Sequence, residues 1–432
     1  MDIEIPYKFK PRDYQIPFLE AMDSGIKRAV LVFHRRAGKD KTCFNLMIKK
    51  ALEKVGNYYY FFPTYSQAKK ALWDAIDKDG LKVLDHIPRQ VLKKKNESDM
   101  RLEFVNGSSI QLIGTENIDS IVGTNPAGCI YSEYSLQNPM AWALIRPILK
   151  ENGGWAVFNF TPRGKNHAFK LFNMAKSNKN WFAQLLTVRD TGILTEADIE
   201  EERKEGMDEE LIQQEYYCDF NIGIQGAYYL KQIQKAEEEK RIGFVPYNED
   251  NEVHTVWDLG IGDAMSIWFY QVAGREIHLI DFYEAQGEGF AYYARILQEK
   301  GYLYGNHFAP HDIMQRELGT GKSRQEVARN LGINFQVVPK LSVEDGIDAV
   351  RRIFNRCWFD EEKCEAGLNA LKNYKKEYDE KRKMFKSRPY HDWASHAADA
   401  FRYFAVGFRD IVIRSSKKEY KTDYPIDPVT GY

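Results

Sequence analysis

A basic segment near the N-terminus has the residue types of a phosphate-binding loop. The sequence Phe33-His34-Arg35-Arg36-Ala37-Gly38-Lys39-Asp40 lies between an apolar run and a helical pattern. Such a loop needs exposed backbone N–H groups, a small residue where phosphate approaches and a lysine for charge. Lys39 is therefore expected to bind the β- and γ-phosphates of ATP. We assign nucleotide binding to Arg35, Arg36, Ala37, Gly38, Lys39, Asp40, Lys41 and Thr42.

This loop departs from the common pattern at two positions. Phe33 stands where the first glycine usually is, and Asp40 stands where a serine or threonine usually holds magnesium. Thr42 is the alternative hydroxyl. A strand, turn and helix with a merely basic turn is the competing interpretation of the same residues.

Two further residues support a nucleotide site. Gln15 lies upstream of the loop, where many helicase-like ATPases place a glutamine that recognises adenine. Glu133 ends the apolar segment 128–131, and ligands of open α/β folds bind at the carboxyl edge of the sheet. Glu133 is predicted to polarise the attacking water as a general base. Ser132 replaces the aspartate that usually holds magnesium.

Three aspartates in the C-terminal half have the pattern of a two-metal nuclease. Asp258 follows an apolar strand, Asp312 follows a shorter strand-like segment, and Asp399 lies on a helix. This order is typical of an RNase H-like nuclease, in which carboxylates converge on two cations. Hard oxygen ligands suit Mg²⁺ or Mn²⁺. Taken singly, each residue could equally be a surface carboxylate. Weaker candidate ligands are Asp263, Asp281 and Asp392.

The helix that carries Asp399 is rich in alanine, which would let it pack closely against a sheet. A basic stretch with interleaved aromatic residues, 372–388, comes directly before it. Contact with the DNA backbone is one interpretation of this stretch, and a solvated hairpin is the other. The predicted DNA-binding residues are Lys381, Arg382, Lys383, Lys386 and Arg388.

Alternating apolar runs and helical patterns must position these groups. Strands are predicted at 29–33, 58–62, 109–113, 128–131 and 156–160, with helices between them, which favours a parallel α/β sheet. Runs at 253–257, 266–270 and 277–280 predict an antiparallel meander followed by strand–helix alternation. We expect a first domain over 1–220, a linker over 221–250, a second domain over 251–415 and a flexible tail over 416–432.

Composition restricts the function classes. The chain has 432 residues, 44% of them hydrophobic, and a net charge of -1, so nucleic acid would be bound by local patches only. Five cysteines without a CxxC pair argue against a disulfide framework or a zinc site, and a reducing cytosol fits. No apolar run is long enough to span a membrane.

Taken together, these residues resemble the large terminase subunit of tailed double-stranded DNA bacteriophages. The resemblance covers roughly residues 10 to 410. Its specific parts are 35–39, 62–64, Thr161-Pro162-Arg163-Gly164, 214–220, 310–312 and Ser395-His396-Ala397-Ala398-Asp399-Ala400-Phe401-Arg402-Tyr403.

The resemblance implies an N-terminal P-loop ATPase, with a parallel sheet flanked by helices, and a C-terminal RNase H-like nuclease with a mixed sheet. Thr161, Pro162 and Arg163 would couple ATP turnover to movement, and Asp258, Asp312 and Asp399 would be the metal ligands. The implied partners are double-stranded DNA, a portal protein and a small terminase subunit. A ring on the portal is implied, with a monomer in isolation as the alternative. The implied location is the host cytoplasm and, transiently, the procapsid.

Two departures from that family matter. Ser132 replaces an aspartate, and Val122 stands where many relatives have an arginine that reaches the neighbouring subunit. Arg35, Arg36, Arg146 and Arg163 are the alternative sources of that charge. One rival function is a helicase-like ATPase and nuclease of DNA repair or restriction. The other is a DNA-binding subunit with an inactive ATP site, which the substitutions at Phe33, Asp40 and Ser132 would allow.

Overall fold

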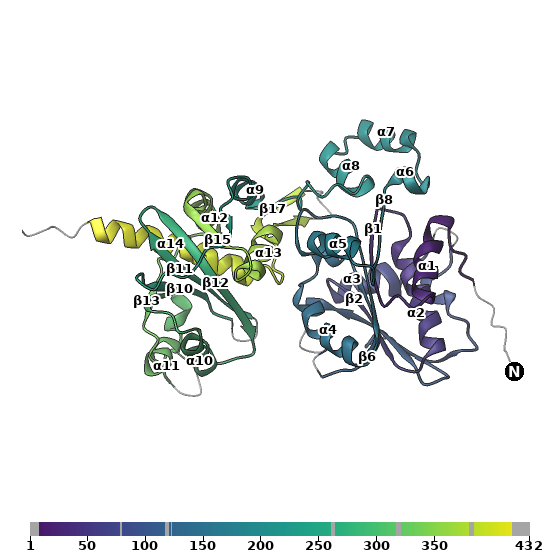
Figure 1. The fold of residues 1–432 in the computed structure, drawn as a ribbon, viewed down its shortest axis with the longest axis horizontal. Helices are drawn as coiled ribbons and strands as arrows, with labels where there is room; N and C mark the ends of the chain where they lie inside the picture. Colours follow the sequence, from purple (N-terminus) through teal and green to yellow (C-terminus); the bar gives the residue numbers. More distant parts are fainter. Residues whose placement is uncertain are drawn as a thin grey trace, which may run out of the picture. The chain divides into compact units, whose positions relative to one another are not determined.

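The chain divides into two compact units, Met1–Gln225 and Gly226–Tyr432 (Figure 1). The computed structural model describes residues 8–77, 80–116, 121, 123–260, 264–316, 321–379 and 384–416. The division falls inside the segment 221–250 that was predicted to be a linker. Residues 226–250 belong to the second unit instead, because they form helix α9 and a strand, β9, that pairs with its sheet.

Within the described residues, the first unit is built on an eight-stranded sheet in the order β3-β4-β5-β2-β6-β7-β1-β8. The six strands from β5 to β8 in this order are mutually parallel, whereas β3, β4 and β5 pair antiparallel. The strand bounds are β1 Arg28–Phe33, β2 Asn57–Phe62, β3 Leu92–Asn96, β4 Arg101–Phe104, β5 Ser109–Gly114, β6 Pro126–Ser132, β7 Trp155–Phe160 and β8 Phe182–Leu186.

Helices cover both faces of this sheet (Figure 1). Alternate residues of β1 explain why: Leu31 packs in the core formed with α1 and α2, and Val32 packs in the core formed with α4 and α5. A strand buried on both faces is expected to be apolar throughout, as β1 is. The helices are α1 Ile16–Asp23, α2 Lys39–Glu53, α3 Tyr65–Ala68, α4 Met140–Glu151, α5 His167–Ser177, α6 Val188–Thr191, α7 Glu196–Lys204 and α8 Glu209–Tyr216.

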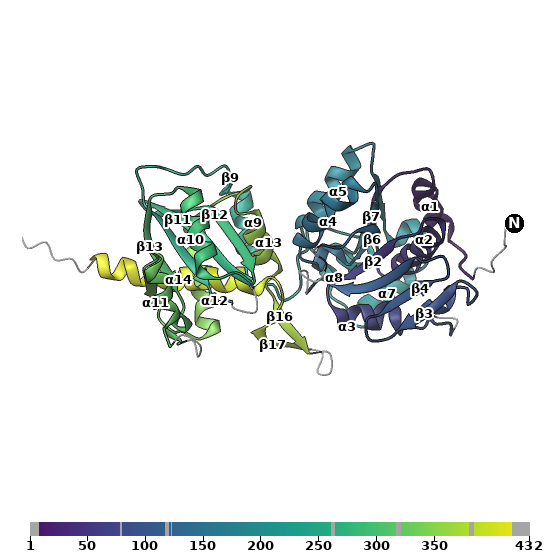
Figure 2. The same ribbon diagram turned by 90° about the horizontal axis from the view of Figure 1, so that it is seen from below.

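The second unit contains, in its described part, a mixed seven-stranded sheet in the order β14-β13-β10-β11-β12-β15-β9. The strands β10, β11 and β12 form the predicted antiparallel meander, and β13 adds parallel to β10. The strand bounds are β9 Ile242–Gly243, β10 Val253–Asp258, β11 Ala264–Ala273, β12 Glu276–Gln286, β13 Tyr304–Ala309, β14 Phe335–Val337 and β15 Cys357–Asp360. A separate hairpin joins β16 Lys376–Asp379 and β17 Met384–Pro389 (Figure 2).

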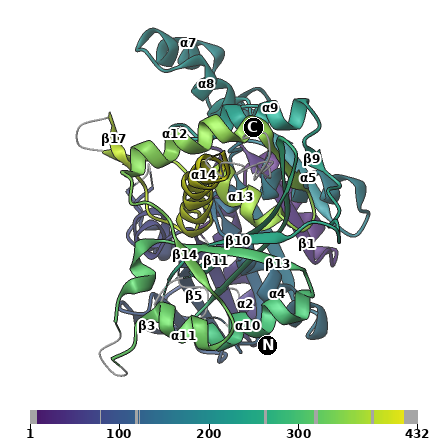
Figure 3. The ribbon, with the colours of Figure 1, turned by 90° about the vertical axis from the view of Figure 1, so that its left-hand side faces the viewer.

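Two helical layers enclose this second sheet. One contains α9, α12, α13 and α14, and the other contains α10 and α11. Helix α14 lies against β10 and β11 (Figure 3), and Trp268 of β11 donates a hydrogen bond from Nε1 to the carbonyl of Ala397 at 2.9 Å. The helix bounds are α9 Leu230–Glu238, α10 Phe290–Lys300, α11 Arg324–Asn330, α12 Val343–Ile353, α13 Glu365–Asn373 and α14 Ser395–Ser416.

The predicted strands and the α/β class are confirmed. In the first unit, sequence reasoning missed β3, β4 and β8, and in the second unit it named no strand at β9, β14 or β15. Of these, β3 is the polar sequence Leu-Lys-Lys-Lys-Asn with its central residues exposed. Such a strand carries no apolar alternation for a pattern to detect. The predicted tail, 416–432, lies outside the described residues from 417 onward. No described helix is both long and apolar enough to cross a membrane.

Candidate nucleotide and nuclease sites

The predicted phosphate loop connects β1 to α2 and is held in place from outside. Tyr14 Oη and Gln15 Nε2 both donate to the carbonyl of Ala37, at 2.8 and 3.1 Å. Gly38 has φ 76°, and a Cβ there would lie 3.3 Å from Gln15 Nε2, so glycine suits both the backbone angle and the close approach. The loop thus presents its backbone at the start of α2, as phosphate binding requires.

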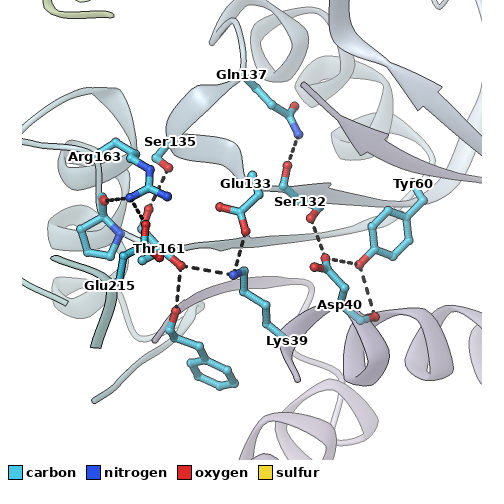
Figure 4. Close-up of polar contacts among 12 residues, drawn as sticks. Lys39, Asp40, Tyr60, Ser132, Glu133, Ser135, Gln137, Thr161, Arg163 and Glu215 are labelled. Carbon is cyan, nitrogen blue, oxygen red and sulfur yellow. Dashed lines mark hydrogen bonds and ion pairs between the residues drawn. The ribbon is translucent and has the colours of Figure 1, made fainter. Parts of the chain in front are cut away.

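Lys39 points toward Glu133 and Thr161 at the carboxyl ends of β6 and β7 (Figure 4). Lys39 Nζ lies 2.7 Å from Glu133 Oε1 and donates to Thr161 Oγ1 at 3.2 Å. Burial by itself would lower the pKa of Lys39, but the nearby carboxylates of Glu133 and Asp40 outweigh it and raise the pKa. Lys39 is therefore a charged group ready to bind phosphate.

Glu133 is held in a backbone conformation that side chains rarely adopt. Its φ is 52°, in the left-handed region, where strain of this kind is often associated with functional sites. Burial would raise the pKa of Glu133, but the cations of Lys39 and Arg163 outweigh it and hold the pKa below its ordinary value. Within the described structure, Glu133 Oε2 is buried and accepts no hydrogen bond. The carboxylate is thus ionised, which is the form that can accept a proton, and Oε2 has no contact with solvent in this structure.

Asp40 and Ser132 meet beside this pair. Asp40 Oδ1 accepts hydrogen bonds from Ser132 Oγ at 2.5 Å and from Tyr60 Oη at 2.9 Å (Figure 4). Lys41 and Thr42 are engaged elsewhere. Lys41 Nζ lies 2.8 Å from Asp77 Oδ2, and the buried Thr42 donates to the carbonyl of Gly38 at 3.1 Å.

The predicted coupling segment, Thr161 to Arg163, links the phosphate loop to α8. Thr161 Oγ1 donates to the carbonyl of Phe33 at 3.2 Å. Arg163 Nη1 lies 2.6 Å from Glu215 Oε1 and donates to Gln214 Oε1 at 2.8 Å. The carbonyl of Glu215 accepts a hydrogen bond from Arg35 N at 2.8 Å, which closes the connection back to the loop.

In the second unit, β10 and α14 bring Asp258 and Asp399 together. Asp258 Oδ2 lies 3.1 Å from His396 Nδ1. Asp399 Oδ1 accepts from Tyr374 Oη at 3.2 Å and from Arg402 Nη2 at 2.9 Å. Burial raises the pKa of Asp258, and the nearby carboxylate of Asp399 raises it further, whereas the hydrogen bond with His396 lowers it. Such repulsion between neighbouring carboxylates is what a bound cation relieves.

A further carboxylate, Glu284, lies in the same row of the sheet. Asp258 pairs with Ser266 and Ser266 pairs with Glu284, so the three side chains share one face of adjacent strands. Ser266 Oγ donates to Glu284 Oε2 at 2.5 Å. Burial raises the pKa of Glu284, the hydrogen bond from Ser266 opposes this, and the charge of Asp258 adds to the rise.

Asp312 lies in the short helix His311–Met314 that follows β13, next to β10 in the sheet. Its side chain is 44% exposed and lies 3.1 Å from His311 Nε2. Besides burial, the charges of Asp258, Asp399 and Asp312 all raise the pKa of Tyr403. Even so, no three His, Cys, Asp or Glu side chains of the described chain are close enough to enclose a metal ion.

Comparisons with known proteins find similarity to large terminases. Residues 255–405 match the sequence model of the terminase RNaseH-like domain family. The large terminase subunit of Escherichia phage T5 is 25% identical over 410 residues, which cover 91% of this chain and 90% of that protein. Both matches are therefore to large terminases, the first over the second unit alone and the second over most of the chain.

Solved structures give weaker similarities. The large terminase from a thermophilic bacteriophage, solved in complex with ADP, is 16% identical, with a TM-score of 0.42 over 91% of this chain and 98% of that one. The ATPase domain of the Thermus phage P74-26 large terminase is 19% identical, with a TM-score of 0.42 over 49% of this chain and 94% of that one. Scores of this size do not establish a common fold by themselves.

Some of the predicted site residues have other contacts in this structure. Gln15 is only 3% exposed, and its amide is engaged by the carbonyl of Ala37 and the N–H of Arg12, so it supports the loop in this structure. Asp281 contacts Lys300 and Tyr302. It is three residues from Glu284 in β12, and an odd separation places the two on opposite faces. Asp281 is therefore wrong as a ligand of the Asp258 site.

Asp392, another of the weaker candidate ligands, has a local structural contact. Asp392 precedes α14 and accepts from the backbone N–H of Ala394 at 3.0 Å, which makes it a local turn residue. Burial raises its pKa. Asp263 lies outside the described residues.

Two of the predicted DNA-binding residues, Lys386 and Arg388, lie on β17 of the β16–β17 hairpin, and a hairpin is the alternative that the sequence left open (Figure 2). Lys386 and Arg388 each lie 2.5 Å from a carboxylate oxygen of Glu377, and together they lower its pKa to about 2. Their charges are thus partly compensated. Lys381, Arg382 and Lys383 lie outside the described residues.

Glu284 is the site residue that sequence reasoning missed. It ends the pattern Asp281-Phe282-Tyr283-Glu284, in which Asp281 was chosen because the apolar run stops at Ile280. The strand continues to Gln286, and only the register of β11 with β12 shows which acid faces Asp258.

The source of the arginine finger stays a prediction. Arg163 is paired with Glu215, whereas Arg35, Arg36 and Arg146 are exposed. Val122, at the position where many relatives have the arginine, lies outside the described residues.

Proposed function

We propose that this chain is a large terminase subunit and acts as a viral DNA-packaging motor. Its first unit would hydrolyse ATP to drive double-stranded DNA into a procapsid, and its second unit would cut concatemeric DNA with the help of divalent metal ions. The observation that carries the proposal is that each compact unit has its own charged site, Lys39 with Glu133 in one and Asp258 with Asp399 in the other.

The ATP site supports hydrolysis by positioning and electrostatics, which dominate phosphoryl transfer. Lys39 would leave Glu133 for the β- and γ-phosphates. Glu133, released from that cation, would orient water through its unpartnered oxygen. Thr161 contacts both Lys39 and the carbonyl that precedes the loop, so movement of Lys39 would reach Arg163 and α8. This connection makes the segment 161–163 the proposed coupling element.

The nuclease site suits Mg²⁺ or Mn²⁺, because buried and mutually repelling carboxylates are compensated by a hard cation. Asp258 and Asp399 would hold the ion, with Asp312 and Glu284 as the candidate further ligands, and a bound cation would have to draw these side chains closer together than they are in this structure. When bound, the metal supplies an activated water and stabilises the departing oxygen. His396 holds the Asp258 carboxylate by a hydrogen bond, and Arg402 holds that of Asp399. Without these two contacts the carboxylates would be free to rotate away from a shared ion.

The proposed partners follow from the family. They are a portal protein, a small terminase subunit and double-stranded DNA, with the chain assembling as a ring on the portal. Its place would be the host cytoplasm and, during packaging, the procapsid.

Paired substitutions test whether the two sites are separate. Lys39→Ala is expected to abolish DNA-stimulated ATP hydrolysis while plasmid cleavage in Mn²⁺ is retained. Asp258→Asn is expected to do the reverse. Lys49→Ala on the exposed side of α2 and Asp348→Asn on α12 are the matched controls.

Two outcomes would refute the proposal. Loss of both activities in either variant, in protein of unchanged thermal stability, would refute two independent sites. Absence of ATP hydrolysis by the unmodified chain, even with DNA and portal protein present, would favour a DNA-binding subunit with an inactive ATP site.

A further inference from the structure

Two substitutions in the ATP site occur at positions that normally act together. In P-loop NTPases the hydroxyl after the phosphate-binding lysine and an aspartate on a neighbouring strand hold the Mg²⁺ of the nucleotide complex. Here the residue after Lys39 is Asp40, and the strand residue before Glu133 is Ser132. Each position has therefore lost the group that it usually supplies.

The structure shows that the two departures face each other. Asp40 lies in the first turn of α2, and Ser132 ends β6 with no exposed surface. Ser132 Oγ donates to Asp40 Oδ1 at 2.5 Å. The pair thus retains one carboxylate and one hydroxyl. The carboxylate is on α2, where the hydroxyl is expected, and the hydroxyl is on β6, where the carboxylate is expected.

The contacts leave half of the Asp40 carboxylate open. Both hydroxyl donors, Ser132 and Tyr60, bond to Oδ1. Neither of these hydrogen bonds involves Oδ2, and Asp40 is only half-buried. An oxygen of this kind, one residue beyond Lys39, can bind a cation that accompanies the phosphates.

We propose that Asp40 and Ser132 have exchanged roles, so that Asp40 supplies the carboxylate and Ser132 the hydroxyl for the divalent cation of the ATP complex. This inference rests on the proposed ATPase function. It also accounts for two of the three substitutions that would otherwise suggest an inactive ATP site, those at Asp40 and Ser132. The charge of the pair is unchanged by the exchange, which explains how both departures can be tolerated together.

The exchange is tested by reversing it. We would measure ATP binding by isothermal titration calorimetry, with and without Mg²⁺, for the unmodified chain, Asp40→Thr, Ser132→Asp and the double variant Asp40→Thr/Ser132→Asp. The first single variant has two hydroxyls and the second has two repelling carboxylates. Asp85→Asn, which removes an exposed carboxylate of the same unit, is the control. Electron paramagnetic resonance of Mn²⁺ in the presence of ATP gives an independent count of bound metal.

We expect Mg²⁺ to raise the ATP affinity of the unmodified chain at least tenfold. Each single variant should lose this gain, and the double variant should regain it to within about threefold, because it restores the common arrangement. Asp40→Asn replaces Asp40→Thr if the latter has lowered thermal stability, and should also lose bound Mn²⁺.

Three results would overturn the proposal. A full Mg²⁺ effect in Asp40→Thr and Asp40→Asn would show that Asp40 does not hold the cation. A double variant no better than the worse single variant would show that the two positions do not act as a pair. Failure of the unmodified chain to bind ATP under any condition would refute the proposed ATPase function together with this inference, whereas the first two results leave that function standing.

Discussion

The ion pair between Lys39 and Glu133 is expected to oppose ATP binding, because the phosphates must take Lys39 from this carboxylate. At 2.7 Å the Coulomb attraction is about 6 kcal/mol for an effective dielectric constant of about 20. Removing the carboxylate charge should increase the ATP-binding energy by only part of this amount. The Glu133 side chain is 28% exposed, so water solvates its carboxylate once Lys39 has left.

The variant Glu133→Gln removes the charge and keeps the shape. We expect it to bind ATP more tightly by about 1–2 kcal/mol, or roughly 5- to 30-fold. Hydrolysis should nevertheless fall by a factor of about 10² to 10⁴, because the general base is lost. Equilibrium titration with a fluorescent ATP analogue measures the first effect, and single-turnover hydrolysis measures the second.

The control is Glu53→Gln, at the C-terminal end of α2, which removes a carboxylate that does not contact Lys39. ATP affinity that falls more than tenfold in Glu133→Gln would refute competition between Glu133 and phosphate. Hydrolysis within tenfold of the unmodified chain would refute Glu133 as the base.

Three other predictions concern packing, pH and metal. A Cβ at Gly346 would lie 2.5 Å from Arg402 Cγ, so Gly346→Ala should move the Arg402 side chain away from Asp399. This variant should lower the free energy of unfolding by about 1–3 kcal/mol. It should also reduce plasmid cleavage without changing ATP hydrolysis. Gly243→Ala, with open space around it, is the control, and equal cleavage by both variants would contradict the idea. Burial lowers the pKa of His167 to about 4, so the unfolded chain takes up this proton at a higher pH than the folded chain does. The free energy of unfolding should therefore fall by up to about 3 kcal/mol as the pH drops from about 6.5 to about 4. Thermal unfolding of His167→Gln at pH 7.5 and 4.5 should show a smaller pH dependence than the unmodified chain, and an identical dependence would refute this. Chelation with EDTA should abolish plasmid cleavage and added Mn²⁺ should restore it; cleavage that persists in EDTA would exclude a metal-dependent site.

Much of this molecule could be predicted from short stretches of chain. The apolar run before the phosphate loop, the Gly38-Lys39 pair and the helical pattern after it are neighbours in sequence, and they form β1, the loop and α2 as expected. The same holds for Asp258 at a strand end and Asp399 among small residues on a helix. Such features follow from periodicity and local backbone preference, which act over a few residues.

The partners of these residues were decided by tertiary structure. Glu284 faces Asp258, and Asp281 does not, because the register of β11 with β12 fixes which side of the sheet each residue occupies. Asp40 meets Ser132 across 92 positions of sequence, so neither substitution is interpretable alone. Long-range pairing of this kind depends on how whole strands and helices pack, and no local pattern in the chain encodes it.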